Sequence, residues 1–285
     1  MILIWQPQAE LALGQPLRRF SALSGGDFAE AYRGELEDGQ SVFIKTHRHP
    51  PAFFFSTEAT GLQWLRHAEG VNVPKVLAVS DSPPFLVLEW IEPGSAIAET
   101  EPELGRLLAS LHYRNQSAYG RPDGRTTGSL GVPNEHHTCW ADFYANCRLL
   151  PLAAIARERN AVSARTIEAI KQLANRLGEY ANFEEPASLL HGDLWAGNRL
   201  VDVRGQSWLV DPAAHHGHRE FDLAMMRLFG GYSEQCFAAY DESYPLQPGW
   251  AERVPLHQLA PLLVHAIKFG GGYISAVDQA VSRYT

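Results

Sequence analysis

The sequence predicts an α+β fold of two lobes, in which a small antiparallel sheet with one helix precedes a mainly helical part. Two observations predict it: short apolar runs separated by turn residues dominate residues 1–91, and apolar residues at helical spacing dominate residues 92–285. The length of 285 residues suits one large domain or two modest lobes. Hydrophobic residues make up 45% and charged residues 20%, a globular composition that excludes disordered and fibrous classes.

Within the first lobe, turn residues divide the chain into short strands. Asp38-Gly39 is a strong hairpin signal between two of them. The strands are expected at residues 20–23, 31–36, 42–45, 76–79 and 85–90. One helix is expected after the third strand, capped by Ser56 or Thr57. The inner face of that helix would carry Ala59, Leu62 and Leu65.

The second lobe is expected to begin after a loop at Glu92–Gly94, and its pattern is helical. Thr100 and Glu103 have the spacing of a capping box. Leucines then follow at helical spacing, at Leu104, Leu107, Leu108 and Leu111. Further helices are expected at about 140–156, 162–181, 220–229, 233–243 and 255–269. A β-rich island interrupts them at 188–191, 199–203 and 207–210.

Charge and cysteine content narrow the classes of partner. Lys and Arg number 24 against 32 Asp and Glu, and the formal charge of −8 without a basic cluster argues against nucleic acid. Cys139, Cys147 and Cys236 are too scattered for a disulfide framework or a zinc site, so buried free thiols are expected. Because the chain has no signal peptide and no run of about 20 apolar residues, we expect a cytoplasmic monomer or weak dimer without a membrane partner.

The segment His191–Asn198 and the residue Asp211 carry the strongest chemical pattern. Asp193 lies five residues before Asn198, and Asp211 follows 13 residues later, after a short hairpin that turns at Gly205. A hydroxyl nucleophile needs a carboxylate that orients it and accepts its proton, which is the role predicted for Asp193. Magnesium prefers hard oxygen ligands, which Asn198 and Asp211 supply. The set resembles the catalytic loop and metal-binding aspartate of the kinase-like phosphotransferases.

Two upstream residues fit the same interpretation. Lys45 ends a predicted strand, where kinases place the lysine that pairs with the α- and β-phosphates of ATP. Glu58 shares a helix face with Leu62 and Leu65, and a carboxylate on an apolar stripe needs a partner. We therefore predict a Lys45–Glu58 ion pair.

The nucleotide would be held by two further segments. Gly25 and Gly26 lie between the first two strands, where their backbone can approach phosphates closely; a plain turn is the alternative. The segment 88–91, with Glu89, Trp90 and Ile91, is the expected hinge whose backbone would bond the adenine edge.

Asp222 and His191 are expected to support the catalytic loop. Asp222 opens a helix, so it is either an ordinary first-turn acid or a carboxylate that accepts N–H bonds from the loop and holds Asp193 in place. His191 opens the loop itself.

The acceptor class follows from the segment after Asp211. Only residues 212–219 separate Asp211 from the next helix, so there is no long activation segment to dock a polypeptide. The triplet His191-Gly192-Asp193 also lacks the arginine of protein kinases. A small-molecule hydroxyl is therefore the expected acceptor.

Over about residues 18–275 the chain resembles the fructosamine kinase family, also called ketosamine-3-kinases. A tryptophan inside the catalytic loop, Trp195, and a Leu-Phe-Gly-Gly-aromatic stretch at 228–232 distinguish this family from its relatives. The other segments that carry the resemblance are residues 24–27, 43–45, 58–62, 86–90, 104–112, 189–198, 211–213, 217–220, 222–225 and 245–246.

The resemblance implies a protein-kinase-like fold and phosphorylation, by ATP with Mg²⁺, of the 3-hydroxyl of a ketosamine on a free amine or a protein lysine. Such phosphorylation makes the adduct labile, so the family is viewed as deglycating. It implies that Trp195 borders the sugar or its amine; a purely packing aromatic is the alternative. His216, in a histidine-rich segment at 215–218, is a second expected substrate contact, although solvated or capping histidines are the simpler interpretation of that segment.

Two other functions remain open at this point. The acceptor could be an aminoglycoside or an amino alcohol such as choline, although the chain has no obvious acidic cluster after Asp211 to suit a polycation. A non-catalytic nucleotide-binding scaffold is disfavoured because all five expected catalytic and phosphate-site residues are present.

Overall fold

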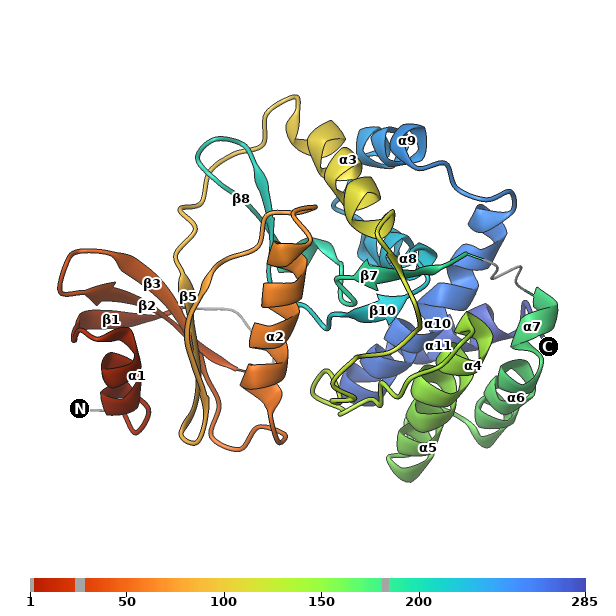
Figure 1. Ribbon diagram of the computed structural model, residues 1–285. Coiled ribbons are helices and arrows are strands. Elements are labelled where there is room, and N and C mark those ends of the chain that lie inside the picture. The colour runs from red at the N-terminus through yellow and green to blue at the C-terminus, as the bar shows by residue number, and fades with distance from the viewer. Residues whose placement is uncertain (1–2, 24–28, 181–184) are drawn as a thin grey trace.

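The computed structural model describes residues 3–23, 29–180 and 185–285, and they form a sheet-rich lobe and a helical lobe (Figure 1). The five-stranded sheet, α1, α2 and the N-terminus lie at one side of the molecule, and most of the other helices and the C-terminus lie at the other. This arrangement confirms the predicted α+β bilobal fold. The exact boundary at residues 91 and 92 stays a prediction.

The N-terminal lobe is built on one antiparallel sheet in the order β1-β2-β3-β5-β4. Its strands are β1 (Leu17–Leu23), β2 (Glu30–Leu36), β3 (Ser41–Thr46), β4 (Val76–Asp81) and β5 (Pro84–Glu89). Lys45 pairs with Ala31 on one side and with Leu86 on the other. Because β3 is the central strand, Lys45 is only 7% exposed.

Two helices accompany this sheet, not the single one expected. Helix α1 (Gln6–Leu13) was not predicted, since Ala9 is its one buried residue among those described and it has no apolar stripe to reveal it. It ends at Gly14, whose left-handed φ of 71° suits a glycine C-cap.

Helix α2 (Phe54–His67) is the predicted helix, but its predicted caps are wrong. Its N-cap is Phe53, in the left-handed region at φ 59°. Ser56 lies inside the first turn, where its N–H donates to Asp81 Oδ1 at 3.2 Å. Tertiary contacts with the β4–β5 turn thus replace the side-chain cap that the sequence suggested.

The C-terminal lobe is mainly helical. Its helices are α3 (Thr100–His112), α4 (Trp140–Tyr144), η1 (Ala145–Leu149), α5 (Leu150–Glu158), α6 (Ala164–Asn175), α7 (Leu177–Tyr180), α8 (Glu220–Phe229), α9 (Glu234–Ser243), α10 (Trp250–Phe269) and α11 (Gly272–Val281). The capping box at Thr100 is not formed. Thr100 is itself helical, and its hydroxyl accepts from Ile97 N and donates to the Gly205 carbonyl at 2.6 Å.

Two small sheets frame the catalytic segment. Strands β6 (Asn115–Gln116), β7 (Ala187–Leu190) and β10 (His215–Gly217) form one, in the order β10-β7-β6, and β8 (Arg199–Val201) and β9 (Ser207–Leu209) form a hairpin. The loop after β7 leads through the 3₁₀ turn η2 (Ala196–Asn198) into β8. Both ends of the predicted catalytic loop are therefore fixed by strands.

A shared core joins the two lobes. Leu62 of α2 packs in the same buried cluster as Leu108 of α3, Leu194 of the catalytic loop and Leu209 of β9. Gly61 allows this close approach, because a Cβ at that position would lie 3.0 Å from Ala214 Cβ. Helix α2 is thus held against the segment that follows Asp211.

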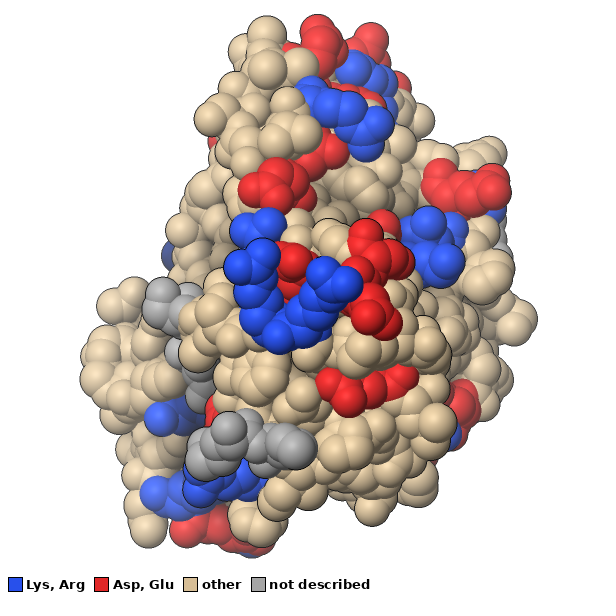
Figure 2. All heavy atoms as spheres, turned by 90° about the vertical axis from the view of Figure 1, so that its left-hand side faces the viewer, with Lys and Arg blue, Asp and Glu red and all other residues tan. Residues whose placement is uncertain are grey.

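The surface carries charges of both signs. On the face in Figure 2, acidic and basic side chains lie next to one another, and the sheet forms ion pairs such as Arg19–Glu35 and Arg33–Glu92. Within the part of the chain that the structure describes, no helix is long and apolar enough to cross a membrane. Cys147 and Cys236 are buried as predicted, but Cys139 is exposed, because it lies at the N-cap of α4.

Candidate active site

Asp193 and Asn198 face each other across the turn that follows β7. Asn198 Nδ2 donates to Asp193 Oδ2 and to the Asp193 carbonyl, both at 2.9 Å. These two bonds fix the amide, so its nitrogen points to Asp193 and its oxygen is left for another partner. The second carboxylate oxygen of Asp193 accepts no hydrogen bond from the described residues. The loop therefore presents one carboxylate oxygen and one amide oxygen side by side.

Asp222 holds this loop through its backbone. Its carboxylate accepts from His191 N at 2.7 Å and from Gly192 N at 2.9 Å, which confirms the predicted support. His191 Nε2 donates to the Val210 carbonyl at 3.0 Å and Nδ1 accepts from Asp193 N at 3.3 Å, which requires the neutral ring. Burial correspondingly lowers the pKa of His191. The support is thus neutral at His191 and anionic at Asp222.

His112 of α3 is part of this support and was missed from the sequence. Its Nε2 lies 3.4 Å from Asp222 Oδ2, and its Nδ1 lies 2.9 Å from Tyr240 Oη. Burial opposes ionisation of Asp222, but hydrogen bonds from His112 and the loop amides lower its pKa overall. His112 is the last residue of the segment 104–112, which contributes to the family resemblance. No local pattern in the sequence connects it with Asp222, 110 residues later.

The environment of Asp193 suits a proton acceptor. Burial, followed by the nearby charge of Asp211, raises the pKa of Asp193 to about 7, against the opposing hydrogen bond from Asn198. A carboxyl group with a pKa near the working pH is suited to general-base catalysis.

Lys45, Glu58 and Asp211 form a triad between the lobes, in which Lys45 and Glu58 are buried and Asp211 is exposed. Lys45 Nζ donates to both carboxylate oxygens of Glu58, at 2.9 and 3.0 Å, which confirms the predicted ion pair. Lys45 also donates to Asp211 Oδ1, across 166 residues of sequence. Burial opposes the charge of Lys45, yet the carboxylates of Asp211 and Glu58 raise its pKa overall. The lysine is therefore a permanent cation at this site.

The side-chain oxygen atoms of Asn198 and Asp211 are suitable ligands for a magnesium ion. Both side chains offer hard oxygen atoms, and the Asn198 amide oxygen accepts no hydrogen bond from the described part of the chain. Asp211 adopts a φ of 56°, a left-handed conformation that is uncommon outside glycine, and this turns its side chain toward Lys45.

A second group of possible metal ligands lies elsewhere. Among the described residues, ligand atoms of His218, Glu220 and His257 lie within 4.8 Å of one another, and all three residues are buried. Glu220, however, already receives two hydrogen bonds from Arg253, at 2.5 and 2.9 Å. Since an arginine is always charged, this group is best described as a neutralised ion-pair cluster.

Of the two segments predicted to hold the nucleotide, the structure describes the hinge at 88–91. Glu89 N donates to the Lys75 carbonyl, and the Glu89 side chain accepts from Lys75 N. The predicted hinge is therefore anchored to the residue that precedes β4. The indole of Trp90 donates to Glu92 and lies under the Arg33 guanidinium. Ile91 follows in the connecting segment. Gly25 and Gly26 lie outside the described residues.

Trp195 is both packed and accessible. Its ring lies over Gly197, where any Cβ would come within 2.5 Å of it, and it meets Phe229 edge-on at 5.8 Å. It remains 37% exposed. His216 lies in β10 with its ring 6.2 Å from Trp64 of α2. The described contacts of His216 do not include Asp193 or Trp195, and both substrate contacts stay predictions.

The other histidines of the 215–218 segment are not solvated. His215 and His218 are each 1% exposed, because β10 runs through the core. His215 stacks on Phe143, and its Nδ1 lies 2.8 Å from the Ala213 carbonyl. The solvated interpretation was therefore wrong, since aromatic neighbours from distant helices cover both rings. In line with the capping alternative, His218 Nδ1 accepts from the N–H of Glu220, the first residue of α8, at 3.3 Å.

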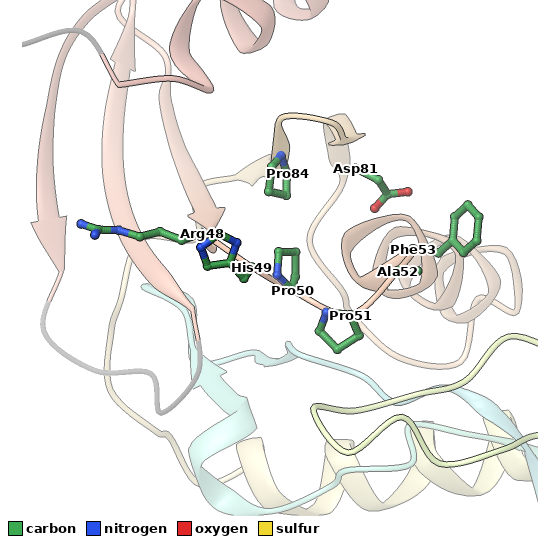
Figure 3. A pocket seen from close by; sticks show the side chains of 8 residues that line it. All are labelled: Arg48, His49, Pro50, Pro51, Ala52, Phe53, Asp81 and Pro84. Carbon is green, nitrogen blue, oxygen red and sulfur yellow. The ribbon is translucent and has the colours of Figure 1, made fainter.

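A separate hollow of about 420 Å³ lies where β3 leads into α2 (Figure 3). It is lined by Arg48, His49, Pro50, Pro51, Ala52, Phe53, Asp81 and Pro84. The residues expected to carry the chemistry are not among its lining residues, so the active site is defined by the converging side chains and not by this hollow.

The comparisons with known proteins agree with this geometry. A family model described as fructosamine kinase matches residues 5–285. Probable ketoamine kinases of Lactiplantibacillus plantarum and Thermus thermophilus are 33% and 36% identical, covering 94% and 91% of this chain and 95% and 92% of theirs. A crystal structure assigned to a fructosamine-3-kinase of Thermobifida fusca has a TM-score of 0.91 at 32% identity, covering 99% and 98% of the two chains.

More distant structures share the fold alone. A choline kinase of Streptococcus pneumoniae has a TM-score of 0.65 at 15% identity and covers 97% of each chain. An aminoglycoside phosphotransferase solved with streptomycin and ATP has the same TM-score at 15% identity, covering 99% of this chain and 97% of that one. The resemblance drawn from the sequence is confirmed.

Proposed function

The chain belongs to the fructosamine kinase family, an ATP-dependent kinase family, and from this premise we propose that it phosphorylates the 3-hydroxyl of a ketosamine of the fructosamine or ribulosamine type. The acceptor would be carried by a free amine or a protein lysine. One observation carries the proposal: Asp193 keeps a free carboxylate oxygen next to Asn198, and Asp211 is bonded to the lysine of the Lys45–Glu58 pair.

Lys45 would pair with the phosphates of ATP. The Glu58 carboxylate holds its ammonium at 2.9 Å, so the cation is positioned before the nucleotide binds. If Glu58 were removed, Asp211 would be the remaining carboxylate that Lys45 contacts among the described residues. Gly25, Gly26 and the hinge at Glu89, Trp90 and Ile91 are the proposed contacts for the phosphates and the adenine.

Asn198 and Asp211 would hold Mg²⁺, which when bound neutralises the phosphate charges. Here the chain's own contribution is to orient the two oxygens: Asn198 through its bonds to Asp193, and Asp211 through Lys45.

Asp193 would act as the base. Its carboxylate accepts the proton of the acceptor hydroxyl while that oxygen bonds to the γ-phosphorus and the bond to the leaving ADP oxygen breaks. Asp222 and His191 keep the loop in place, so that the carboxylate does not have to reorganise during the step.

The acceptor would lie against Trp195, with His216 as a second proposed contact. An exposed indole face suits the protonated amine of a ketosamine. The short segment 212–219 leaves no room for a polypeptide-docking loop, so a protein substrate would enter only through its modified lysine.

The test is ADP release with Mg²⁺ and ATP, measured with ribulosamine, fructosamine, an aminoglycoside and choline in turn. We expect turnover with the ketosamines. Turnover of the aminoglycoside or choline alone would overturn the ketosamine assignment and keep the kinase.

The Asp193→Asn variant tests the mechanism in the same assay. The amide cannot accept the hydroxyl proton, so we expect turnover to fall at least about 10²-fold, with ATP binding and melting temperature retained. Asp38→Asn, at an exposed carboxylate in the β2–β3 hairpin, is the matched control. Near wild-type turnover in Asp193→Asn would remove this residue from the mechanism.

A further inference from the structure

A continuous group of aromatic side chains extends from the catalytic loop to the end of α10. Phe229 meets Trp195 at 5.8 Å and His265 at 4.8 Å. His265 in turn meets Tyr273 at 5.0 Å and Phe269 at 5.6 Å. Trp195 and Phe269 are 37% and 50% exposed, and the other three are partly buried. We call these five residues the aromatic wall.

Lys268 places a positive charge on this wall. It lies in the last turn of α10, is exposed, and holds its ammonium 5.1 Å from the centre of the Phe269 ring. Within residues 3–23, 29–180 and 185–285, Lys268 forms no ion pair with a carboxylate, whereas many other cations of the chain do. Burial and Asp211 raise the pKa of Asp193 overall, and the charge of Lys268 is among the weaker effects that oppose this rise.

The catalytic loop itself supplies no cation between Asp193 and Asn198, where the sequence is Leu-Trp-Ala-Gly. Lys268, over the Phe269 ring, is therefore the basic side chain that the aromatic wall offers to a ligand. A ligand with only positive charge is disfavoured on such a surface, because Lys268 repels it. A ligand that carries both an ammonium and an anionic group satisfies Trp195 and Lys268 together.

We infer that Lys268 is a specificity residue that pairs with an anionic group on the amine side of the acceptor, so that the enzyme favours ketosamines of free amino acids over those of uncharged amines. This inference rests on the proposed ketosamine kinase activity. The α-carboxylate of an amino acid lies next to the secondary amine, so an acceptor held by its amine at Trp195 would direct its anion along the wall that ends at Lys268. The same charge argues against aminoglycosides and choline, which have no anion to offer.

The test compares two acceptors that differ only in charge, ribulosyl-glycine and ribulosyl-glycinamide, with the wild-type protein, Lys268→Met and Lys268→Glu. We expect the wild type to prefer the carboxylate form. In Lys268→Met the ratio of kcat/KM for the two acceptors should fall about fivefold, the upper range for an exposed ion pair, through KM. Lys268→Glu should reverse the preference. Lys171→Met, at an exposed lysine of α6, is the control and should keep the wild-type ratio.

Several results would overturn the inference, and each points elsewhere. An equal loss of kcat with both acceptors would assign Lys268 to the transferred phosphoryl group. An unchanged ratio with a lower melting temperature would assign it to the helix C-terminus. In both cases the ketosamine activity stands. If the wild type turns over neither acceptor, the proposed function and this inference fail together.

Discussion

Trp195 is placed to serve both packing and the proposed recognition of the acceptor. One face of its ring is fixed by Gly197 and its edge by Phe229, so the indole is held in place without being buried. A ring that is pre-organised in this way loses little conformational entropy when a ligand stacks on it. The alternatives set out from the sequence, substrate contact or packing aromatic, are thus compatible in a single residue.

Trp195→Ala is expected to raise the KM for a ketosamine about two- to fivefold, the value of an exposed cation–π contact. The KM for ATP should stay unchanged, because the nucleotide contacts lie with Lys45. Steady-state kinetics with each substrate varied in turn measures this. Trp195→Phe keeps an aromatic face and should recover most of the loss. Equal losses for ATP and ketosamine, with a lower melting temperature, would leave Trp195 a packing role only.

At the scale of elements, α2 links the nucleotide site to the catalytic lobe. Glu58 projects from it to Lys45, and one turn later Gly61 lies against Ala214, three residues after Asp211. The spacing of the Lys45–Glu58 pair could be predicted, because an acid on an apolar helix face demands a partner. Contact between Gly61 and Ala214 could not, since it depends on how two distant segments pack.

Gly61→Val should disturb both functions of α2. The added side chain would overlap Ala214, and overpacking of a core costs about 1–3 kcal/mol of unfolding free energy. Displacement of α2 would also loosen the Glu58–Lys45 pair, so we expect a KM for ATP raised several-fold. Thermal unfolding and ATP kinetics measure the two effects. Gly178→Val, at an α7 glycine with open space around it, is the matched control. A wild-type KM for ATP in Gly61→Val would show that α2 does not set the position of Lys45.

The sequence predicted the ends of a helix correctly only where local residue patterns determine those ends. The helix predicted at 220–229 is α8 to the residue, but the one predicted at 140–156 is interrupted by the π-turn η1. The helix predicted from 255 begins at Trp250, with Pro255 inside it. Packing in the core tolerates these irregularities, and no periodicity in the sequence records them.

At the scale of the whole molecule, the active site depends on residues that the chain brings together from far apart. Asp193 and Asn198 lie in one loop, so their spacing alone predicted them. Lys268 and His112 come from α10 and α3, and only the assembled fold shows that they act on Asp193 and Asp222. What the sequence could not predict is therefore the set of contacts made between elements, and it is to these contacts that we assign the proposed acceptor specificity.

The buried cluster of His218, Glu220 and His257 makes the stability of the whole fold depend on pH. Burial, and then the charges of His257 and its other neighbours, shift the pKa of His218 to about 3, well below its ordinary value of 6.5. The pKa of Glu220 is about 2, since the hydrogen bonds from Arg253 and His257 outweigh the effect of burial. The unfolded chain therefore binds protons that the folded chain does not, below about pH 6.5 at His218 and below about pH 4.5 at Glu220.

The stability contributed by this cluster should thus be complete above pH 6.5 and decline as the pH falls toward 3. Asp193, whose pKa burial and Asp211 raise to about 7, changes stability in the opposite direction over this range. The contribution of the cluster is therefore measured as the difference in melting temperature between the wild type and a variant without His218, from pH 7.5 to 4. His218→Phe keeps an aromatic ring for stacking on His257 but cannot bind a proton. As the pH falls from 6.5 to 4.5, its melting temperature should therefore rise relative to that of the wild type. His49→Gln, at an exposed histidine, should retain the wild-type slope. If His218→Phe and the wild type lost stability in parallel over this interval, the acid sensitivity would have to arise from other groups.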